Sequence, residues 1–250
     1  MKISKQWVLL GGVTFAAALG TLFLRPVPQW PDYHHFIDQR TIWGIPCFMD
    51  VVSNLPFLLV GLLGFKEVLR QRARGLFQDP WEALPYMLFF LSFFCTALGS
   101  TYYHLAPDDA RLVWDRIPIT MIAMSLVSIV LMEKTGVQTA IRLLGPLLVL
   151  GVGSVVYWRW TGDLRFYGFV QFYPVLFVPL VLYLFSKPFP AIGELVRLVI
   201  CYGLAKFFEW KDVEVFSITG GMVSGHTLKH LLAALGVWWI VRMLRKRRKP

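Results

Sequence analysis

Charged side chains are scarce in this sequence. Asp, Glu, Lys and Arg make up 16% of its 250 residues, whereas soluble proteins carry about 25%. Apolar residues make up 56%. Runs of about 20 of them recur along the chain, and each run is long enough to cross the roughly 30 Å hydrocarbon core of a bilayer. The composition excludes an ordinary soluble domain and predicts an all-α polytopic membrane protein.

Cysteine is rare and sequence repeats are missing. The three cysteines, Cys47, Cys95 and Cys201, are far apart and form no CxxC motif, so no disulfide framework is implied. No pair of repeated or Gly/Pro-broken halves is visible, which argues against a transporter.

The net charge of +10 does not indicate a nucleic-acid partner. Much of this charge lies in short loops and in the terminal cluster 245–249. Such a cluster is typical of a cytoplasmic face, where it sets orientation and attracts anionic lipid. The lipid bilayer is therefore the expected partner, and the sequence leaves the question of protein partners open.

Eight apolar segments are separated by Pro-rich or polar clusters. They cover residues 7–24, 47–68, 82–104, 112–133, 138–158, 168–186, 192–211 and 221–243. The first could be a signal peptide, but it is long for one and lacks a clean cleavage site, so we expect an uncleaved helix. We therefore divide the chain into an N-terminal membrane helix, residues 1–30, which could act as a signal anchor, and a seven-helix domain, residues 31–250, with a basic tail.

The distribution of Lys and Arg predicts the orientation. With a cytoplasmic N-terminus, fifteen of these residues fall on the inner side and seven on the outer side. Both termini are then cytoplasmic. The basic tail and short loops suit a bacterial inner membrane.

Five polar residues inside the apolar segments are candidates for a functional site. His104 ends one segment, Ser100 precedes it by four residues, and Asp115 begins the next segment. His226 and His230 lie in the last segment, roughly 8 and 14 Å past its expected start at 1.5 Å per residue. The predicted orientation places His104, Asp115 and the His226/His230 pair in the outer half of the bilayer, and ionisable residues within the membrane usually serve a function.

The residue types favour a zinc site. His226 and His230 share one helix face and offer two ligands, and His104 adds a third nitrogen. A fourth position remains for water, which zinc activates. Asp115 is the candidate proton acceptor and Ser100 the candidate donor to an oxyanion. Haem would leave one histidine unused, while iron remains an alternative to zinc.

Each candidate also has a purely structural interpretation. Membrane histidines often form helix–helix hydrogen bonds. Asp115 could pair with Arg111 or Arg116, and Ser100 could bond back to its own helix. The common predicted depth favours a functional site over these separate explanations.

Further polar residues surround these candidates. Asp50, Ser53 and Asn54 share a helix face and either line the cavity, support the site or pack between helices. Lys229 and Glu209 could form an ion pair. The segment 28–46 either caps the outer mouth of the cavity or is a plain surface loop.

The motif residues resemble those of the alkaline ceramidase family. Ser-x3-His (Ser100 to His104), an Asp eleven residues on (Asp115) and His-x3-His in the last helix (His226 to His230) are its pattern. The family belongs to the CREST group of seven-helix membrane hydrolases, which includes the adiponectin receptors. The resemblance covers residues 40 to 243. It implies zinc on the three histidines, catalytic Asp115 and Ser100, and hydrolysis of ceramide to a fatty acid and a sphingoid base.

The resemblance has limits. Cys47 stands where eukaryotic-type family members carry a calcium-binding acid, which argues against a calcium site. The last motif also lacks the aromatic residues found between the histidines of many ceramidases. We therefore expect a zinc hydrolase of a ceramide-like lipid amide. The alternatives are a receptor-like or scaffold protein with a structural zinc ion, and a zinc hydrolase of an ester lipid.

Overall fold

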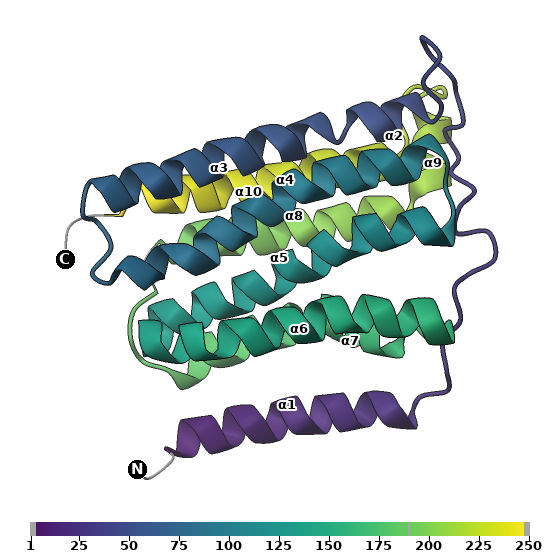
Figure 1. Cartoon of the computed structure of the whole chain (residues 1–250). Coiled ribbons are helices and arrows are strands. Elements are labelled where there is room, and N and C mark those ends of the chain that lie inside the picture. Colours follow the sequence, from purple (N-terminus) through teal and green to yellow (C-terminus); the bar gives the residue numbers. More distant parts are fainter. Residues whose placement is uncertain (1–3, 190, 248–250) are drawn as a thin grey trace.

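The computed structural model describes residues 4–189 and 191–247, and the regular elements within these ranges are helices. They are α1 (Lys5–Phe23), α2 (Phe48–Val52), α3 (Leu55–Ala73), α4 (Ala83–Leu105), α5 (Asp109–Thr135), α6 (Val137–Thr161), α7 (Arg165–Leu184), α8 (Ile192–Trp210), α9 (Asp212–Ile218) and α10 (Gly225–Arg245). A single 3-10 turn, Pro80–Glu82, precedes α4. The long helices lie side by side along one direction (Figure 1).

Seven helical stretches are long and apolar enough to cross a membrane, so the expected all-α polytopic membrane fold is confirmed. They are Lys5–Phe23, Phe48–Ala73, Pro80–Leu105, Asp109–Thr135, Val137–Thr161, Arg165–Leu184 and Gly225–Arg245. Their surfaces carry many exposed apolar side chains, such as Leu59, Val149 and Tyr183. These side chains need lipid around them, since water would leave a large apolar surface uncovered.

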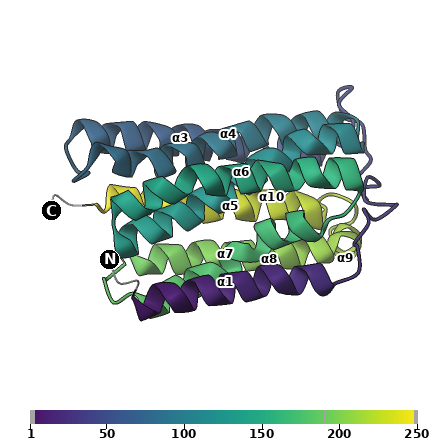
Figure 2. The ribbon, with the colours of Figure 1, turned by 60° about the horizontal axis from the view of Figure 1, so that its bottom comes forward.

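Helix α8 corresponds to the predicted segment 192–211. It is not among the seven stretches that are apolar enough to cross a membrane. Its 19 residues include Glu194, Arg197, Lys206 and Glu209. It nevertheless packs along α10 and runs the length of the bundle. Helix α1 begins and α10 ends at the same end of the bundle (Figures 1 and 2). Helix α8 is the eighth long helix that runs along the bundle.

The helices form two groups that share α4. One group places α10 between α3 and α8, and the other packs α6 and α7 on α5. Helix α4 contacts both α3 and α5. Residues of both groups contribute to one large core, in which Phe90, Val130 and Val237 are buried.

The N-terminal helix α1 lies at the edge of the bundle beside α7 (Figures 1 and 2). Only 6% of its most apolar stretch is buried. Polar contacts fix its position: the Thr14 hydroxyl lies 2.9 Å from the Tyr173 hydroxyl. At its C-terminal end, Arg165 donates to the Leu24 carbonyl at 2.6 Å. The Asp163 carboxylate accepts the Val27 N–H at 3.2 Å.

The basic C-terminal cluster has a structural role beyond the expected orientation signal. Arg247 donates to Glu133 at 2.9 Å and also pairs with Glu82. Lys246 pairs with Glu194. These carboxylates are largely buried, and a buried acid without a partner would be strongly unfavourable. Part of the cluster therefore neutralises acids of the bundle, while residues 248 and 249 lie outside the described ranges.

Candidate metal centre

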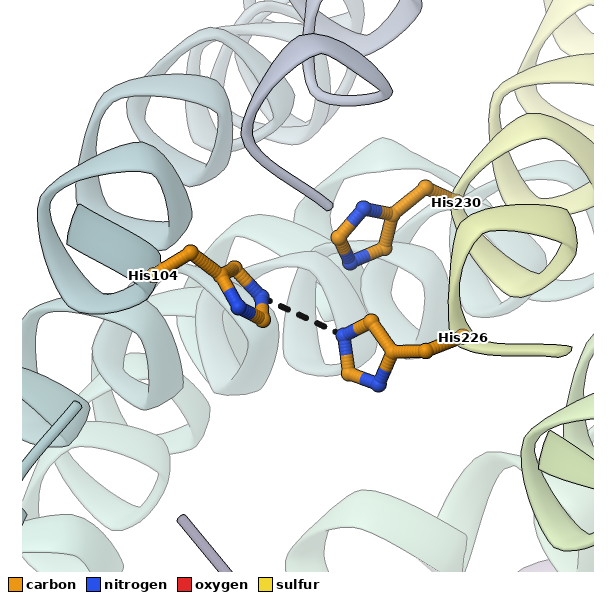
Figure 3. A group of neighbouring side chains, drawn as sticks. All are labelled: His104, His226 and His230. Carbon is orange, nitrogen blue, oxygen red and sulfur yellow. Dashed lines mark hydrogen bonds between the residues drawn. The ribbon is translucent and has the colours of Figure 1, made fainter. Parts of the chain in front are cut away.

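Three histidines from two helices converge at one end of the bundle. His104 is the second-to-last residue of α4, and His226 and His230 belong to the first turns of α10. Figure 3 shows their rings facing one another. Their potential ligand atoms lie within 4.8 Å of one another, and all three side chains are buried. The structure thus brings together the three histidines that the sequence pattern selected.

The spacing of the ring nitrogens suits a small metal ion. His104 Nε2 and His226 Nε2 are 3.2 Å apart. Two nitrogens bound to one tetrahedral zinc at about 2.0–2.1 Å would be about 3.3 Å apart. Three neutral imidazoles are also a usual donor set for catalytic zinc. The residues present therefore fit the expected metal.

His226 and His230 lie nearer the start of their helix than predicted. Helix α10 begins at Gly225, because Gly220 and Gly221 adopt positive φ angles of 63° and 76° and form a turn. The two histidines are therefore about 1.5 and 7.5 Å past the helix start at 1.5 Å per residue. The predicted start at residue 221 was wrong because the apolar pattern continues through this turn.

Ser53 determines which nitrogen of His230 faces the centre. Its hydroxyl donates to the Asp50 carbonyl oxygen at 3.0 Å. The hydroxyl has only one proton, so the contact of 2.8 Å with His230 Nδ1 makes Ser53 the acceptor there. His230 Nδ1 then carries the ring proton, and Nε2 is left unprotonated for a metal. Such neighbours of metal-binding histidines fix ring orientation and tautomer.

A break in the expected helix 47–68 places Ser53. Helix α2 ends at Val52 and α3 begins at Leu55. In between, the Asn54 side chain donates to the Asp50 carbonyl at 2.9 Å, so it competes for a carbonyl that a continuous helix would use. The prediction of one unbroken helix was wrong here. Ser53 contacts His230, Asp50 connects α2 to the start of α10, and the hydrogen bonds recorded for Asn54 stay within its own segment.

Two carboxylates hold the N-terminus of α10. Asp50, which is fully buried, accepts hydrogen bonds from Ser224 at 3.2 Å and Thr227 at 3.0 Å. Asp212 accepts the backbone N–H of His226 at 2.7 Å. Negative groups at a helix N-terminus are favourable because the unpaired N–H groups point toward them. Together they fix the turn that carries His226.

Ser100 and Asp115 lie close together where α4 and α5 meet. Gly99 allows this approach, since a Cβ atom there would lie 2.1 Å from the Trp114 carbonyl oxygen. Both candidate side chains face the same cavity, and the Ser100 hydroxyl lies beside the Asp115 carboxylate.

The two arginines considered as partners of Asp115 bond elsewhere. Arg111 donates to Asp108 at 2.5 Å, and Arg116 donates to Gln29 at 2.7 Å. Within the residues that the structure describes, neither forms an ion pair with Asp115. Asp115 is thus available to a ligand in the cavity.

The cavity has a volume of about 840 Å³ and is largely apolar. Helices α1, α5, α7, α8 and α10 all contribute to its wall, and His230 lies in that wall with Ser100 and Asp115. Pockets for small ligands usually measure about 300–1,000 Å³. The space suits the reacting part of a lipid.

The segment between α1 and α2 covers the other side of the histidines. The Phe36 ring lies 4.5 Å from the His104 ring and 4.8 Å from the His226 ring, centroid to centroid. His34 is 2.9 Å from the Tyr103 hydroxyl. The segment 28–46 is therefore a cap over the site and not a plain surface loop. Sequence reasoning did not select Phe36, because nothing in the pattern distinguishes it from the many other aromatic residues.

Lys229 approaches the site from the cavity. It donates to Glu209 at 2.8 Å, which is the ion pair anticipated from the sequence, and Glu209 also accepts from Lys206 at 2.7 Å. Lys229 Nζ lies 3.3 Å from His226 Nδ1. An ammonium group only donates, so this contact requires an unprotonated Nδ1. Metal on His226 Nε2 would put the proton on Nδ1 and leave Lys229 to Glu209.

Comparisons of this chain with protein-family models, curated proteins and solved structures found no match, so the family resemblance rests on the motif residues alone.

Proposed function

We propose that this protein is a zinc-dependent intramembrane hydrolase that cleaves the amide bond of a ceramide-like lipid. The products would be a free fatty acid and a sphingoid-type amine. One observation carries the proposal: three buried histidines converge beside an apolar cavity that also contains Asp115 and Ser100. The resemblance of these five residues to the alkaline ceramidase pattern supports the choice of an amide substrate.

The metal would be held by His104, His226 and His230. When bound there, zinc would activate a water molecule as the nucleophile and polarise the substrate carbonyl. Within the described part of the chain, no fourth His, Cys, Asp or Glu joins the three histidines. A metal site with three protein ligands keeps a position open, as catalytic sites do and structural sites do not. This favours hydrolysis over the receptor-like alternative.

The chain's own residues would handle the protons of the reaction. Asp115 accepts a proton from the attacking water while the C–O bond forms, and later delivers it to the amine as the C–N bond breaks. Ser100 donates a hydrogen bond to the carbonyl oxygen as negative charge develops on it. Ser53 keeps His230 in the tautomer that leaves Nε2 free.

The test is fatty-acid release, measured by mass spectrometry on purified protein. The panel contains N-acyl sphingoid lipids, N-acyl amino lipids and ester lipids. The expected result is release from one N-acyl class. His230→Ala should abolish this release, and Asp115→Ala should reduce it at least about a hundredfold, since general acid–base catalysis contributes about 10²–10⁴. His35→Ala is the matched control, because His35 is exposed and outside the site.

Three results would decide against the proposal in different ways. Full activity in both His230→Ala and Asp115→Ala would refute the mechanism. Release of fatty acid from the ester lipids alone would show that the protein hydrolyses an ester bond and not an amide bond. No release from any lipid by folded, zinc-loaded protein would favour the receptor-like alternative.

A further inference from the structure

Arg116 is a buried cation that forms no ion pair within the part of the chain that the structure describes. Its side chain belongs to α5, directly after Asp115, and is 3% exposed. One nitrogen, Nη2, donates to Gln29 at 2.7 Å. The other two, Nε and Nη1, have no hydrogen-bond partner within the described residues. A buried charge that is neither paired nor fully hydrogen-bonded is unfavourable, so its position in the protein requires an explanation.

Aromatic rings surround this guanidinium group. Its central carbon lies 4.0 Å from the Trp158 ring, 4.6 Å from the Tyr167 ring and 5.3 Å from the Tyr33 ring. Cation–π contacts of this kind offset part of the burial penalty and hold the group in one orientation. They supply no negative charge. The group is therefore held in place without a carboxylate in direct contact among the described residues.

Arg116 lines the same cavity as Asp115 and His230. Trp158 and Tyr167 belong to helices, whereas Tyr33 belongs to the cap and is 40% exposed. Tyr33 is thus the ring that a ligand can displace to reach the guanidinium nitrogens.

The remaining charges of the cavity also leave an excess of positive charge. Lys206 and Lys229 both bond to Glu209, so two cations share one carboxylate. Arg165, another cation in the wall, is paired with Asp163. With Asp115 counted against Arg116, the cavity keeps one cation in excess before any metal is added, as a site for an anionic ligand would.

We propose that Arg116 binds an anionic group, a carboxylate or a phosphate, on the amine side of the lipid substrate. Guanidinium groups are well suited to both anions. This inference rests on the proposed amide hydrolysis and narrows it: the preferred substrate is an N-acyl amide with a charged head, and a neutral analogue binds more weakly.

The test compares two lipids that differ only in head charge, N-oleoylglycine and N-oleoylethanolamine. Competitive binding is measured by native mass spectrometry on the purified protein without added metal, so that binding is read independently of turnover. Wild-type protein should prefer the anionic lipid by roughly tenfold to a hundredfold, the range expected for a charge-assisted hydrogen bond. Arg116→Gln should reduce the preference to less than about threefold. Arg111→Gln, a change of the same charge on the same helix outside the cavity, should keep it.

Equal binding of the two lipids by wild-type protein would overturn the inference, and so would a preference that survives in Arg116→Gln. If Arg116→Gln does not fold, Arg116→Lys replaces it: a reduced or lost preference for the anionic lipid supports the inference, and an unreduced preference opposes it. Oleate and oleyl alcohol form a second pair. An equally strong Arg116-dependent preference for oleate would assign the anion site to the fatty-acid product and overturn the head-group assignment.

Hydrolysis of the same two lipids separates this inference from the proposed function. An Arg116-dependent preference without any hydrolysis by zinc-loaded protein would retain the anion site and reject the hydrolase. Hydrolysis of both lipids at equal rates, with equal binding, would retain the hydrolase and reject the anion site.

Discussion

At the scale of single residues, the hydroxyl of Ser53 connects two helices at the candidate metal centre. It donates to the Asp50 carbonyl and accepts from His230 Nδ1. The same atom therefore bonds to α2 and selects the tautomer of a candidate ligand on α10. The His104 ring has no comparable support, since its Nδ1 lacks a partner among the described residues. We therefore expect the orientation of His230 to be the better defined of the two.

Ser53→Ala is expected to weaken zinc binding by roughly tenfold to a hundredfold, the usual effect of removing such a supporting hydrogen bond. Zinc affinity is measured by competition with a chromophoric chelator. Ser125→Ala is the matched control, because Ser125 is fully buried and its hydroxyl has no partner in the described part of the chain. An equal loss of affinity in both variants would show that the tautomer of His230 is not responsible.

At the scale of helices, the start of α10 depends on close backbone contact. A Cβ atom on Gly225 would lie 2.0 Å from the Phe208 carbonyl oxygen and 2.7 Å from the Asp212 Cα atom. Both are backbone atoms, so neither can rotate away. Any larger residue must move α10 away from α8 and α9, and His226 moves with it.

Gly225→Ala should therefore lower both the stability of the bundle and its affinity for zinc. Overpacking of this kind costs about 1–3 kcal/mol. Unfolding in detergent and the chelator competition provide the two measurements. Gly203→Ala in α8 is the control, because a Cβ atom added there would have no neighbouring atom within 4 Å. If Gly225→Ala had the same stability and zinc affinity as Gly203→Ala, this would contradict the close backbone contact at Gly225.

The attachment of α1 provides a prediction about pH. Asp163, in the turn between α6 and α7, accepts hydrogen bonds from Arg165 and from the backbone of Val27, and these lower the pKa of its carboxyl group below the ordinary value. A lowered pKa in the folded state stabilises the fold above the unfolded pKa of about 3.9. This contribution disappears as the pH falls below that value through the folded pKa.

We therefore expect the junction between α1 and the bundle to loosen in acid. Hydrogen exchange at the amide of Val27, corrected for the intrinsic effect of pH, should show lower protection below pH ~4 than at pH ~7. In Asp163→Asn the protection should be lower at neutral pH and should change less on acidification. Identical pH profiles for the two proteins would exclude Asp163 as the cause.

At the scale of the whole molecule, the three histidines bring α4 and α10 together. These two helices both pack on α3. His104 is on α4 and the other two are on α10. A metal ion bound to all three would tie α4 directly to α10. Because such an ion binds the folded bundle and not the separated helices, its binding free energy adds to stability.

Removal of zinc by a chelator should therefore lower the unfolding temperature, and added zinc should restore it. At a free zinc concentration of 100 times the Kd, the stabilisation would be about 2.7 kcal/mol. The effect should be absent or small in His230→Ala and unchanged in His35→Ala. Thermal unfolding followed by tryptophan fluorescence gives the measurement, and a zinc effect of the same size in His230→Ala would place the ion elsewhere.

The sequence by itself determined the fold class and the candidate residues. Membrane-spanning helices are recognised from local composition, because a segment in lipid must be apolar along its length and satisfy its own backbone. The pairing of His226 with His230 is equally local, since residues four apart share a helix face. The charged helix α8 shows the limit of composition, because its neighbours within the bundle accommodate side chains that lipid would not.

Only the tertiary structure determined which contacts these residues make. Two helix boundaries could not be predicted from the apolar pattern: the break at Ser53 and Asn54, and the start of α10 at Gly225. Both depend on side-chain and backbone geometry. The position of Phe36 over the histidines depends on the path of the cap, and the surroundings of Arg116 depend on how α5, α6 and α7 pack against one another. The energies of such contacts arise between residues that are distant in sequence, so no local pattern contains them.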